Sequence, residues 1–176
     1  MRRLVLAVGV LVVAVSVPAC GKHKATVGSS SHPSTVDGDC RLDDRFDPGQ
    51  SHVVNGTPVT YQVQPPSGGN HWQSPLPPGV YTPDQQVPEA PAVHSLEHGY
   101  IDVWYRVGID KATVDKLAAY VRRTQPDTLL LPVANLPVPV AATAWHHRLL
   151  CSSADLSAID RFETRWVNQG PEKIPH

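Results

Sequence analysis

The segment YIDVWYRVGIDKATVDKLAAYVRR, residues 100–123, decides the fold class, because two different periodicities follow one another within it. Apolar residues alternate along Tyr100–Val107, which predicts a β-strand. Along Lys111–Arg123 the apolar positions recur at helical spacing, and Asp110 precedes them as a candidate N-cap. The segment therefore predicts a strand followed directly by an amphipathic helix.

Downstream of this segment the sequence predicts further strands and one more helix. Residues 127–133 and 138–150 are rich in β-forming residues and are predicted as two strands. Ser152 and Asp155 form an approximate capping box before an amphipathic helix, which we expect to stop at Gly170.

Upstream of Tyr100 the chain is irregular. Residues 52–64 carry β-forming residues around an Asn55-Gly56 turn, and residues 65–92 contain eight prolines. Proline breaks helix interiors, so 18 prolines in 176 residues exclude a long helical bundle. We predict a single α+β domain: a mostly antiparallel sheet of about four strands, two helices on one face of it, and a long Pro-rich loop.

Residues 1–19 have the pattern of a signal peptide, because a positive start is followed by an uncharged apolar stretch too short to span a bilayer. The sequence VPACG, residues 17–21, resembles the lipobox of bacterial lipoproteins, in which the chain is cut before the cysteine and lipid is attached to it. We expect Cys20 to be lipidated. The alternative is a plain secretory signal with Cys20 as a free thiol.

Residues 20–38 are small and polar, which predicts a flexible tether to a domain spanning residues 40–176. We therefore expect a lipid-anchored protein on the extracytoplasmic face of the cell membrane, or a secreted one if Cys20 carries no lipid. The expected partner is the membrane itself, and the sequence specifies no protein partner. A formal charge of −1 excludes a strongly basic nucleic-acid binder.

Cys40 and Cys151 remain once Cys20 is assigned to lipid. Two thiols in an oxidising compartment allow one pairing, so we predict a Cys40–Cys151 disulfide. The alternative is two separate buried thiols.

Three histidines flank the Pro-rich loop: His71 near its start, and His94 and His98 at its end. Residues four apart are neighbours on a helix but about 13 Å apart on a strand, so His94 and His98 can share an ion only if residues 93–98 form a helical turn. His71 would then supply a third nitrogen for Cu²⁺ or Zn²⁺, with Glu97 as an orienting group, a further ligand or a base. The alternative is a hydrogen-bonded His/Glu network without metal.

The other histidines are weaker candidates. His52 is predicted to lie at the surface of a strand edge. His146 and His147 are adjacent in a predicted strand, so their side chains would point in opposite directions. The pattern H-x-x-E-H at residues 94–98 also matches an inverted zinc-protease motif, but the flanking prolines and glycine exclude the long helix that this motif needs.

Several motifs resemble those of one bacterial family. They are PPSGGNHW (65–72), GVY (79–81), VHSLEHGYIDVWY (93–105), ATAW (142–145) and GPE (170–172). Over about residues 45–172 the chain is similar to the family of domain of unknown function 3105. The resemblance implies that His71, His94, Glu97 and His98 occupy the family's His/Glu motif positions, and that the protein is secreted or membrane-attached. It implies no activity.

These observations lead to one main hypothesis: an envelope lipoprotein that holds or handles Cu²⁺ or Zn²⁺ through His71, His94 and His98. A Met-rich Cu⁺ site is excluded because the only methionine is Met1. Two alternatives stay open. One is a metal-free interaction module of the envelope, and the other is a metal-dependent hydrolase or oxidoreductase with Glu97 as base. The sequence does not decide whether the protein is an enzyme.

Overall fold

The computed structural model describes residues 28–29, 36–124 and 126–173. The predicted signal peptide, Cys20 and most of the predicted tether lie outside these residues. No helix within the described ranges is both long and apolar enough to cross a membrane. In chain order the elements are β1 (Gly28–Ser29), β2 (Val36–Asp37), β3 (Cys40–Asp43), β4 (Arg45–Phe46), β5 (His52–Val53), β6 (His71–Trp72), β7 (Gly79–Val80), the 3₁₀ helix η1 (Pro83–Gln85), α1 (Glu89–Glu97), β8 (Ile101–Arg106), α2 (Lys111–Thr124), β9 (Thr128–Val133), β10 (Val140–Ala144), β11 (His147–Cys151) and α3 (Leu156–Trp166).

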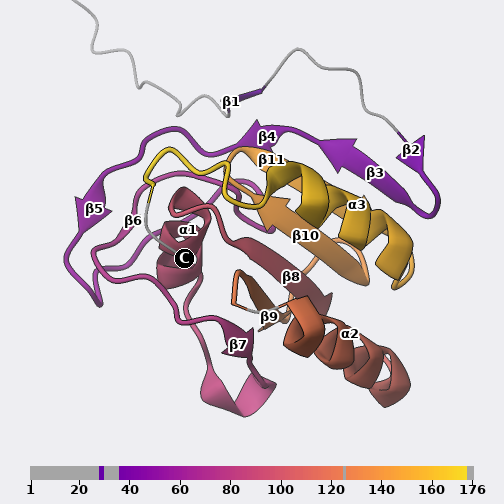
Figure 1. Cartoon of the computed structure of the whole chain (residues 1–176). Helices are drawn as coiled ribbons and strands as arrows, with labels where there is room; N and C mark the ends of the chain where they lie inside the picture. The colour runs from indigo at the N-terminus through magenta and orange to yellow at the C-terminus, as the bar shows by residue number, and fades with distance from the viewer. Residues whose placement is uncertain (1–27, 30–35, 125, 174–176) are drawn as a thin grey trace, which may run out of the picture.

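The main sheet has seven strands in the order β2-β3-β11-β10-β8-β9-β7 (Figure 1). Neighbours pair antiparallel from β2 to β8, whereas β8, β9 and β7 pair in parallel. The predicted α+β class is confirmed. The expectation of about four strands is wrong, because two-residue strands such as β2 and β7 are too short to show a periodicity in the sequence.

The described residues contain three α-helices rather than the two predicted. The additional helix is α1, which begins inside the Pro-rich stretch. Pro88 precedes α1, and Pro91 lies in its first turn, where its missing N–H removes no intrahelical hydrogen bond. The number of prolines predicted irregular structure here, but both prolines stand at positions where they do not interrupt the helix.

The two long helices share one face of the main sheet, as predicted. Leu117 of α2 and Ile159 of α3 pack with Val103 and other apolar residues of the central strands. Trp104 points to the opposite face, where it packs with Ala92 of α1 and with parts of the Pro-rich segment. Strand β8 is thus buried on both faces.

The predicted strands at 100–107 and 127–133 are confirmed as β8 and β9, and the predicted helix at 111–123 as α2. Residues 138–150 form not one strand but a hairpin of β10 and β11. His146 lies in the turn with a φ of 64° and is therefore not a strand residue.

Side-chain caps begin both long helices. Asp110 accepts a hydrogen bond from Thr113 N at 2.8 Å, which confirms it as the cap of α2. Asp155 is itself the N-cap of α3, because its carboxylate accepts from Ala158 N at 3.0 Å. The capping box predicted with Ser152 is therefore displaced, and α3 ends at Trp166, before Gly170.

A disulfide joins Cys40 and Cys151, as predicted. The two residues are register partners on the adjacent strands β3 and β11. They are 111 positions apart in the chain, and the chain-entropy model gives such a loop roughly 4–5 kcal/mol of stabilisation.

A row of buried polar residues crosses the face of the sheet that α1 covers. Asp102, Thr143, Arg148 and Asp43 are register partners on β8, β10, β11 and β3, and all are buried. Arg148 Nη2 lies 2.8 Å from Asp43 Oδ2, and its Nη1 donates to the carbonyl of Gln64 at 2.6 Å. This guanidinium therefore fixes the start of the Pro-rich segment on the sheet.

Candidate metal centre

Strands β5 and β6 bring two histidines side by side. They pair in parallel with His52 opposite His71, and His71 N donates to Ser51 O at 3.1 Å. His71 is fully buried, and its Nδ1–H donates to Gly69 O at 2.8 Å. Because Nδ1 is occupied by this bond, the lone pair that His71 can offer is on Nε2.

The chain around His71 is fixed by buried polar contacts rather than by regular structure. The Asp47 carboxylate accepts from the backbone N–H groups of Gln62 at 2.7 Å and Val63 at 3.0 Å. Tyr61 donates from its hydroxyl to Asn70 O at 2.8 Å. These bonds hold the Pro-rich segment in one conformation directly before His71.

Helix α1 presents His94, Glu97 and His98 near its C-terminal end, so the helical turn that a shared ion would require at residues 93–98 is present. Ser95 anchors the helix by donating to Leu76 O at 2.9 Å. His94 Nδ1–H donates to Trp72 O at 2.5 Å, so His94, like His71, directs Nε2 away from a backbone carbonyl. A backbone acceptor on Nδ1 is the usual arrangement of a metal-binding histidine.

The C-terminal segment adds Glu172. A Cβ atom at Gly170 would lie 2.1 Å from Glu97 O, so only glycine permits the segment to approach the end of α1 this closely. Gly99 has a φ of +94°, and a Cβ there would lie 2.7 Å from the Asn168 backbone. Glu172 N then donates to Glu97 O at 3.1 Å, which places the Glu172 carboxylate beside His98.

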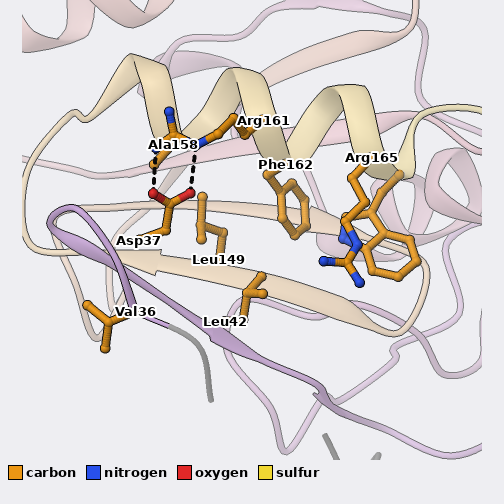
Figure 2. A pocket seen from close by; sticks show the side chains of 9 residues that line it. Val36, Asp37, Leu42, Leu149, Ala158, Arg161, Phe162 and Arg165 are labelled. Carbon is orange, nitrogen blue, oxygen red and sulfur yellow. Dashed lines mark hydrogen bonds and ion pairs between the residues drawn. The ribbon is translucent and has the colours of Figure 1, made fainter. Parts of the chain in front are cut away.

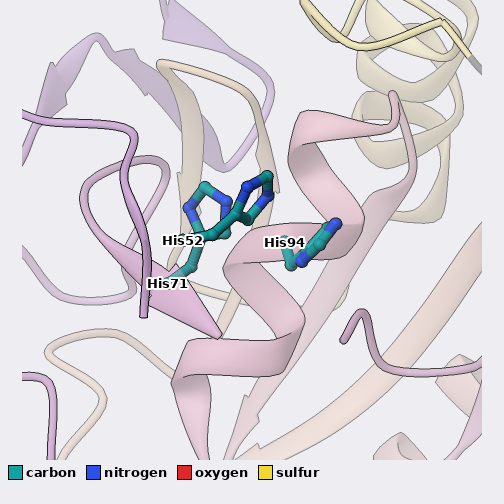
Figure 3. Close-up of side chains that lie close together, drawn as sticks. All are labelled: His52, His71 and His94. Carbon is teal, nitrogen blue, oxygen red and sulfur yellow. The ribbon is translucent and has the colours of Figure 1, made fainter. Parts of the chain in front are cut away.

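Six side chains meet at this point, and we call them the His/Glu cluster. The ligand atoms of His52, His71 and His94 all lie within 4.8 Å of one another (Figure 3). A second group, which shares His52 and His94, includes both carboxylates within the same limit. The members of the cluster are His52, His71, His94, Glu97, His98 and Glu172.

Close contacts connect the members of the cluster. Glu97 Oε2 lies 2.9 Å from His71 Nε2 and 3.1 Å from His52 Nε2. His98 Nε2 lies 3.0 Å from His94 Nε2 and 2.9 Å from Glu172 Oε2. Since Nδ1 of His71 already carries a hydrogen, its Nε2 lone pair faces a carboxylate. An imidazole nitrogen and a carboxylate oxygen that face each other in this way are both ligand atoms suited to a cation.

The charge state of His94 favours metal binding. Burial lowers the pKa of His94, and the other imidazoles of the cluster lower it further, whereas the hydrogen bond to the Trp72 carbonyl raises it. The net lowering of this pKa keeps the imidazole neutral at neutral pH, and a neutral imidazole is the form that binds metal.

The sequence-predicted site residues His71, His94, Glu97 and His98 all lie in the His/Glu cluster, with His94 in contact with both other predicted ligands. His52 is exposed on a short strand, as predicted for a surface residue at a strand edge, but its pairing with His71 also brings its ring into the cluster. Sequence reasoning missed Glu172. The GPE motif was the available signal, but it was used only as a helix stop and as a family motif, with no role assigned to its glutamate.

The adjacent pair His146 and His147 contributes nothing to the cluster. His146 stacks on Phe46 at a centroid distance of 3.7 Å, and burial lowers its pKa to about 4. His147 Nδ1 lies 2.9 Å from Asp44, and its ring stacks on Trp166.

A separate groove lies on the other face of the main sheet, between α3 and the strands. Its apolar wall includes Leu42, Leu149 and Phe162, and Arg161 forms an ion pair with Asp37 at its edge (Figure 2). The groove contains no histidine and no cluster of metal-ligating side chains within the described residues. The candidate metal-ligating side chains therefore lie at the C-terminal end of α1 and not in this groove.

The fold and the cluster together define an α+β domain with a buried His/Glu centre. The family model described as protein of unknown function (DUF3105) matches residues 52–175, more than half of the chain, and the chain belongs to this family. This confirms the family that the sequence motifs indicated. No curated protein and no solved structure matches the chain.

Four of the five motifs that carry the family resemblance meet at or beside the cluster. PPSGGNHW contributes His71, and VHSLEHGYIDVWY contributes the three residues of α1. ATAW places Trp145 edge-on against the His71 ring at a centroid distance of 5.9 Å, and GPE contributes the close approach and Glu172. Four distant stretches of sequence thus serve one site.

Proposed function

We propose that this chain binds a divalent transition metal, Zn²⁺ or Cu²⁺, in the His/Glu cluster and holds or transfers it outside the cytoplasm, anchored to the membrane through Cys20. The observation that carries the proposal is the matched orientation of His71 and His94. Each buried imidazole donates Nδ1–H to a backbone carbonyl and directs Nε2 into the His/Glu cluster.

The ligand types favour these two metals. Imidazole nitrogens and carboxylate oxygens suit Zn²⁺ and Cu²⁺, whereas Cu⁺ prefers sulfur ligands. Both Cys40 and Cys151 are in the disulfide, so neither offers a thiolate. A disulfide also fits an oxidising compartment, in which copper is present as Cu²⁺.

One side of the cluster is accessible to solvent. The side chains of His52 and Glu172 are 39% and 51% exposed, while the His71 side chain is 0% exposed. An ion can therefore enter from the exposed side and bind to ligands that are already oriented. This combination supports holding and transfer, because the metal remains within reach of an external acceptor.

Hydrolysis with Glu97 as general base is less well supported. Glu97 Oε2 faces two imidazole nitrogens within 3.1 Å, which is the position of a ligand or an orienting group. A base needs its lone pair directed at a substrate or a water molecule. In a hydrolase, Glu97→Gln would abolish turnover while the metal stayed bound.

The test is metal content of the purified full chain after chelation and reloading with Zn²⁺ or Cu²⁺ alone. We expect tight, stoichiometric binding that weakens at least tenfold in His71→Ala and in His52→Ala, whose partly exposed side chain makes misfolding a lesser concern. His147→Ala removes a histidine outside the cluster and serves as the matched control. A folded wild-type chain that binds neither ion would overturn the proposal and favour the metal-free interaction module.

A further inference from the structure

The His/Glu cluster divides into two sets of identical composition, each with two imidazoles and one carboxylate. In the first set Glu97 Oε2 lies 2.9 Å from His71 Nε2 and 3.1 Å from His52 Nε2. The second set comprises His94, His98 and Glu172. Each set has the composition of a two-histidine, one-carboxylate metal site, which leaves open coordination positions on the ion.

Distances within the second set are also those of ligands around one ion. His98 Nε2 lies 3.0 Å from His94 Nε2 and 2.9 Å from Glu172 Oε2, and His94 Nε2 lies 4.0 Å from the same oxygen. Ligand atoms at 2.0–2.2 Å from a metal lie roughly 3 Å apart when adjacent and at most about 4.4 Å apart when opposite. All three separations fall within this range.

One ion cannot use all six side chains where they now lie. In the described part of the chain, the groups whose ligand atoms all lie within 4.8 Å of one another contain three or four members of the cluster, never all six. A six-coordinate ion at bond lengths of about 2.2 Å would need every pair within about 4.4 Å. The six side chains therefore cannot all bind a single ion in their present positions.

The two sets are nevertheless adjacent. The ring centroids of His52 and His94, which belong to different sets, are 4.6 Å apart, and those of His71 and His94 are 5.0 Å apart. Two ions placed in neighbouring sets would be only a few ångströms from each other, as in two-metal sites, where the ions are about 3.5–4 Å apart.

We infer that the cluster binds two divalent metal ions, one at His52, His71 and Glu97 and one at His94, His98 and Glu172. This inference rests on the proposed function and specifies its stoichiometry. The first ion lies in the more buried set, which contains the fully buried His71. The second lies beside the exposed Glu172 and exchanges more readily with solvent.

The experiment counts ions per chain. The full chain is stripped with a chelator, loaded with Zn²⁺ alone, passed through a desalting column and subjected to elemental analysis, with calorimetric titration in parallel. We expect two Zn²⁺ per wild-type chain. The double variant His98→Ala/Glu172→Gln should retain one, and so should His52→Ala/Glu97→Gln, while the control His147→Ala retains two.

Single Glu172→Gln keeps the test decisive if a double variant does not fold, because it changes only an exposed side chain. It should weaken the second binding step at least tenfold and leave the first unchanged. With Cu²⁺ as the probe, wild type should show the electron paramagnetic resonance signature of coupled ions, and Glu172→Gln at one equivalent should not.

The outcomes separate the two proposals. No Zn²⁺ on the folded wild-type chain contradicts metal binding altogether. One Zn²⁺ per wild-type chain, or a double variant in either set that abolishes all binding, contradicts the two-ion arrangement and leaves the proposed function standing.

Discussion

The two faces of the main sheet differ in how they are covered and in what they bury. The face toward α2 and α3 buries apolar residues such as Val103, Ala142 and Leu149 beneath two regular amphipathic helices. The opposite face buries Arg148 and Asp102 beneath α1 and an irregular Pro-rich segment. The face toward α2 and α3, the regular face, therefore provides stability. On the face toward α1, the irregular face, buried polar groups hold the chain that carries the His/Glu cluster.

Removing the disulfide should have the largest effect on stability. Cys40 and Cys151 belong to the apolar core on the α2/α3 face, and a loop of this length contributes roughly 4–5 kcal/mol in the chain-entropy model. We expect Cys40→Ala/Cys151→Ala to lower the free energy of unfolding by about 4 kcal/mol in urea titrations. Under conditions where the variant is still folded, its Zn²⁺ affinity should equal that of wild type. A parallel loss of Zn²⁺ affinity would show that the His/Glu cluster also depends on the core of the α2/α3 face.

The next largest effect should come from Arg148→Met on the irregular face. The guanidinium is 1% exposed and pairs with Asp43, and breaking a buried ion pair costs about 3–5 kcal/mol. Because Arg148 also donates to Gln64 O, we expect the variant to lose Zn²⁺ affinity as well as stability. The matched control is Arg161→Met, whose ion pair with Asp37 is 56% and 36% exposed and therefore contributes far less to stability.

The buried ion pair between Arg148 and Asp43 also predicts that the stability of the fold depends on pH. Burial alone would raise the pKa of Asp43, but hydrogen bonds from Arg45 and Arg148 hold it well below its usual range. The carboxylate therefore stabilises the fold above the unfolded-state pKa of about 3.9, and this contribution is lost as the pH falls further. The difference in unfolding free energy between wild type and Arg148→Met should accordingly shrink in acid. A difference that stays constant to pH 2 would rule out the ion pair as its source.

The sequence predicted the regular face much better than the irregular one. Alternation in Tyr100–Val107 and helical spacing after Asp110 gave β8 and α2 with nearly correct boundaries, because such patterns record burial against a continuous core. The β10–β11 hairpin was missed because its two turn residues, Trp145 and His146, include none of the Gly, Asn, Asp or Pro residues that usually mark such a turn.

At the site, helical spacing identified the local pair His94 and His98, and the position of His71 at the other end of the Pro-rich loop indicated a third member. His94 and His98 were paired correctly because four residues on a helix fix their separation. His52 was underrated because its place depends on a parallel pairing with His71, 19 residues away. Glu172 comes from still farther along the chain, and only the Gly170 contact with α1 brings it in.

A smaller effect, of opposite sign, is expected for Asp102→Asn. Asp102 is fully buried, its carboxyl oxygens have no hydrogen-bond partner among the described residues, and burial raises its pKa well above the usual value. The native state therefore keeps this proton, while the unfolded chain releases it above about pH 3.9, so rising pH favours unfolding. Asn carries no such penalty. We expect the variant to be more stable than wild type at pH 7, by a difference that grows as the pH rises above the unfolded-state pKa.

The pH profile separates this explanation from a simple packing change. Thermal unfolding of both proteins should give nearly equal midpoints at pH 4 and diverge as the pH rises. A variant that is equally stabilised at pH 4 and pH 7 would show that ionisation of Asp102 is not the cause.

The smallest effect should be confined to the α2/α3 face. Asp155 caps α3 by accepting from Ala158 N, and replacing such a cap by alanine costs about 1 kcal/mol. Asp155→Ala should lower the urea midpoint slightly and leave both Zn²⁺ binding steps unchanged, because α3 lies on the face opposite α1. Hydrogen exchange should quicken only in the first turn of α3. If exchange near α1 quickened too, the faces would be coupled through the sheet, and the cluster would depend on the apolar core as much as on the buried polar row.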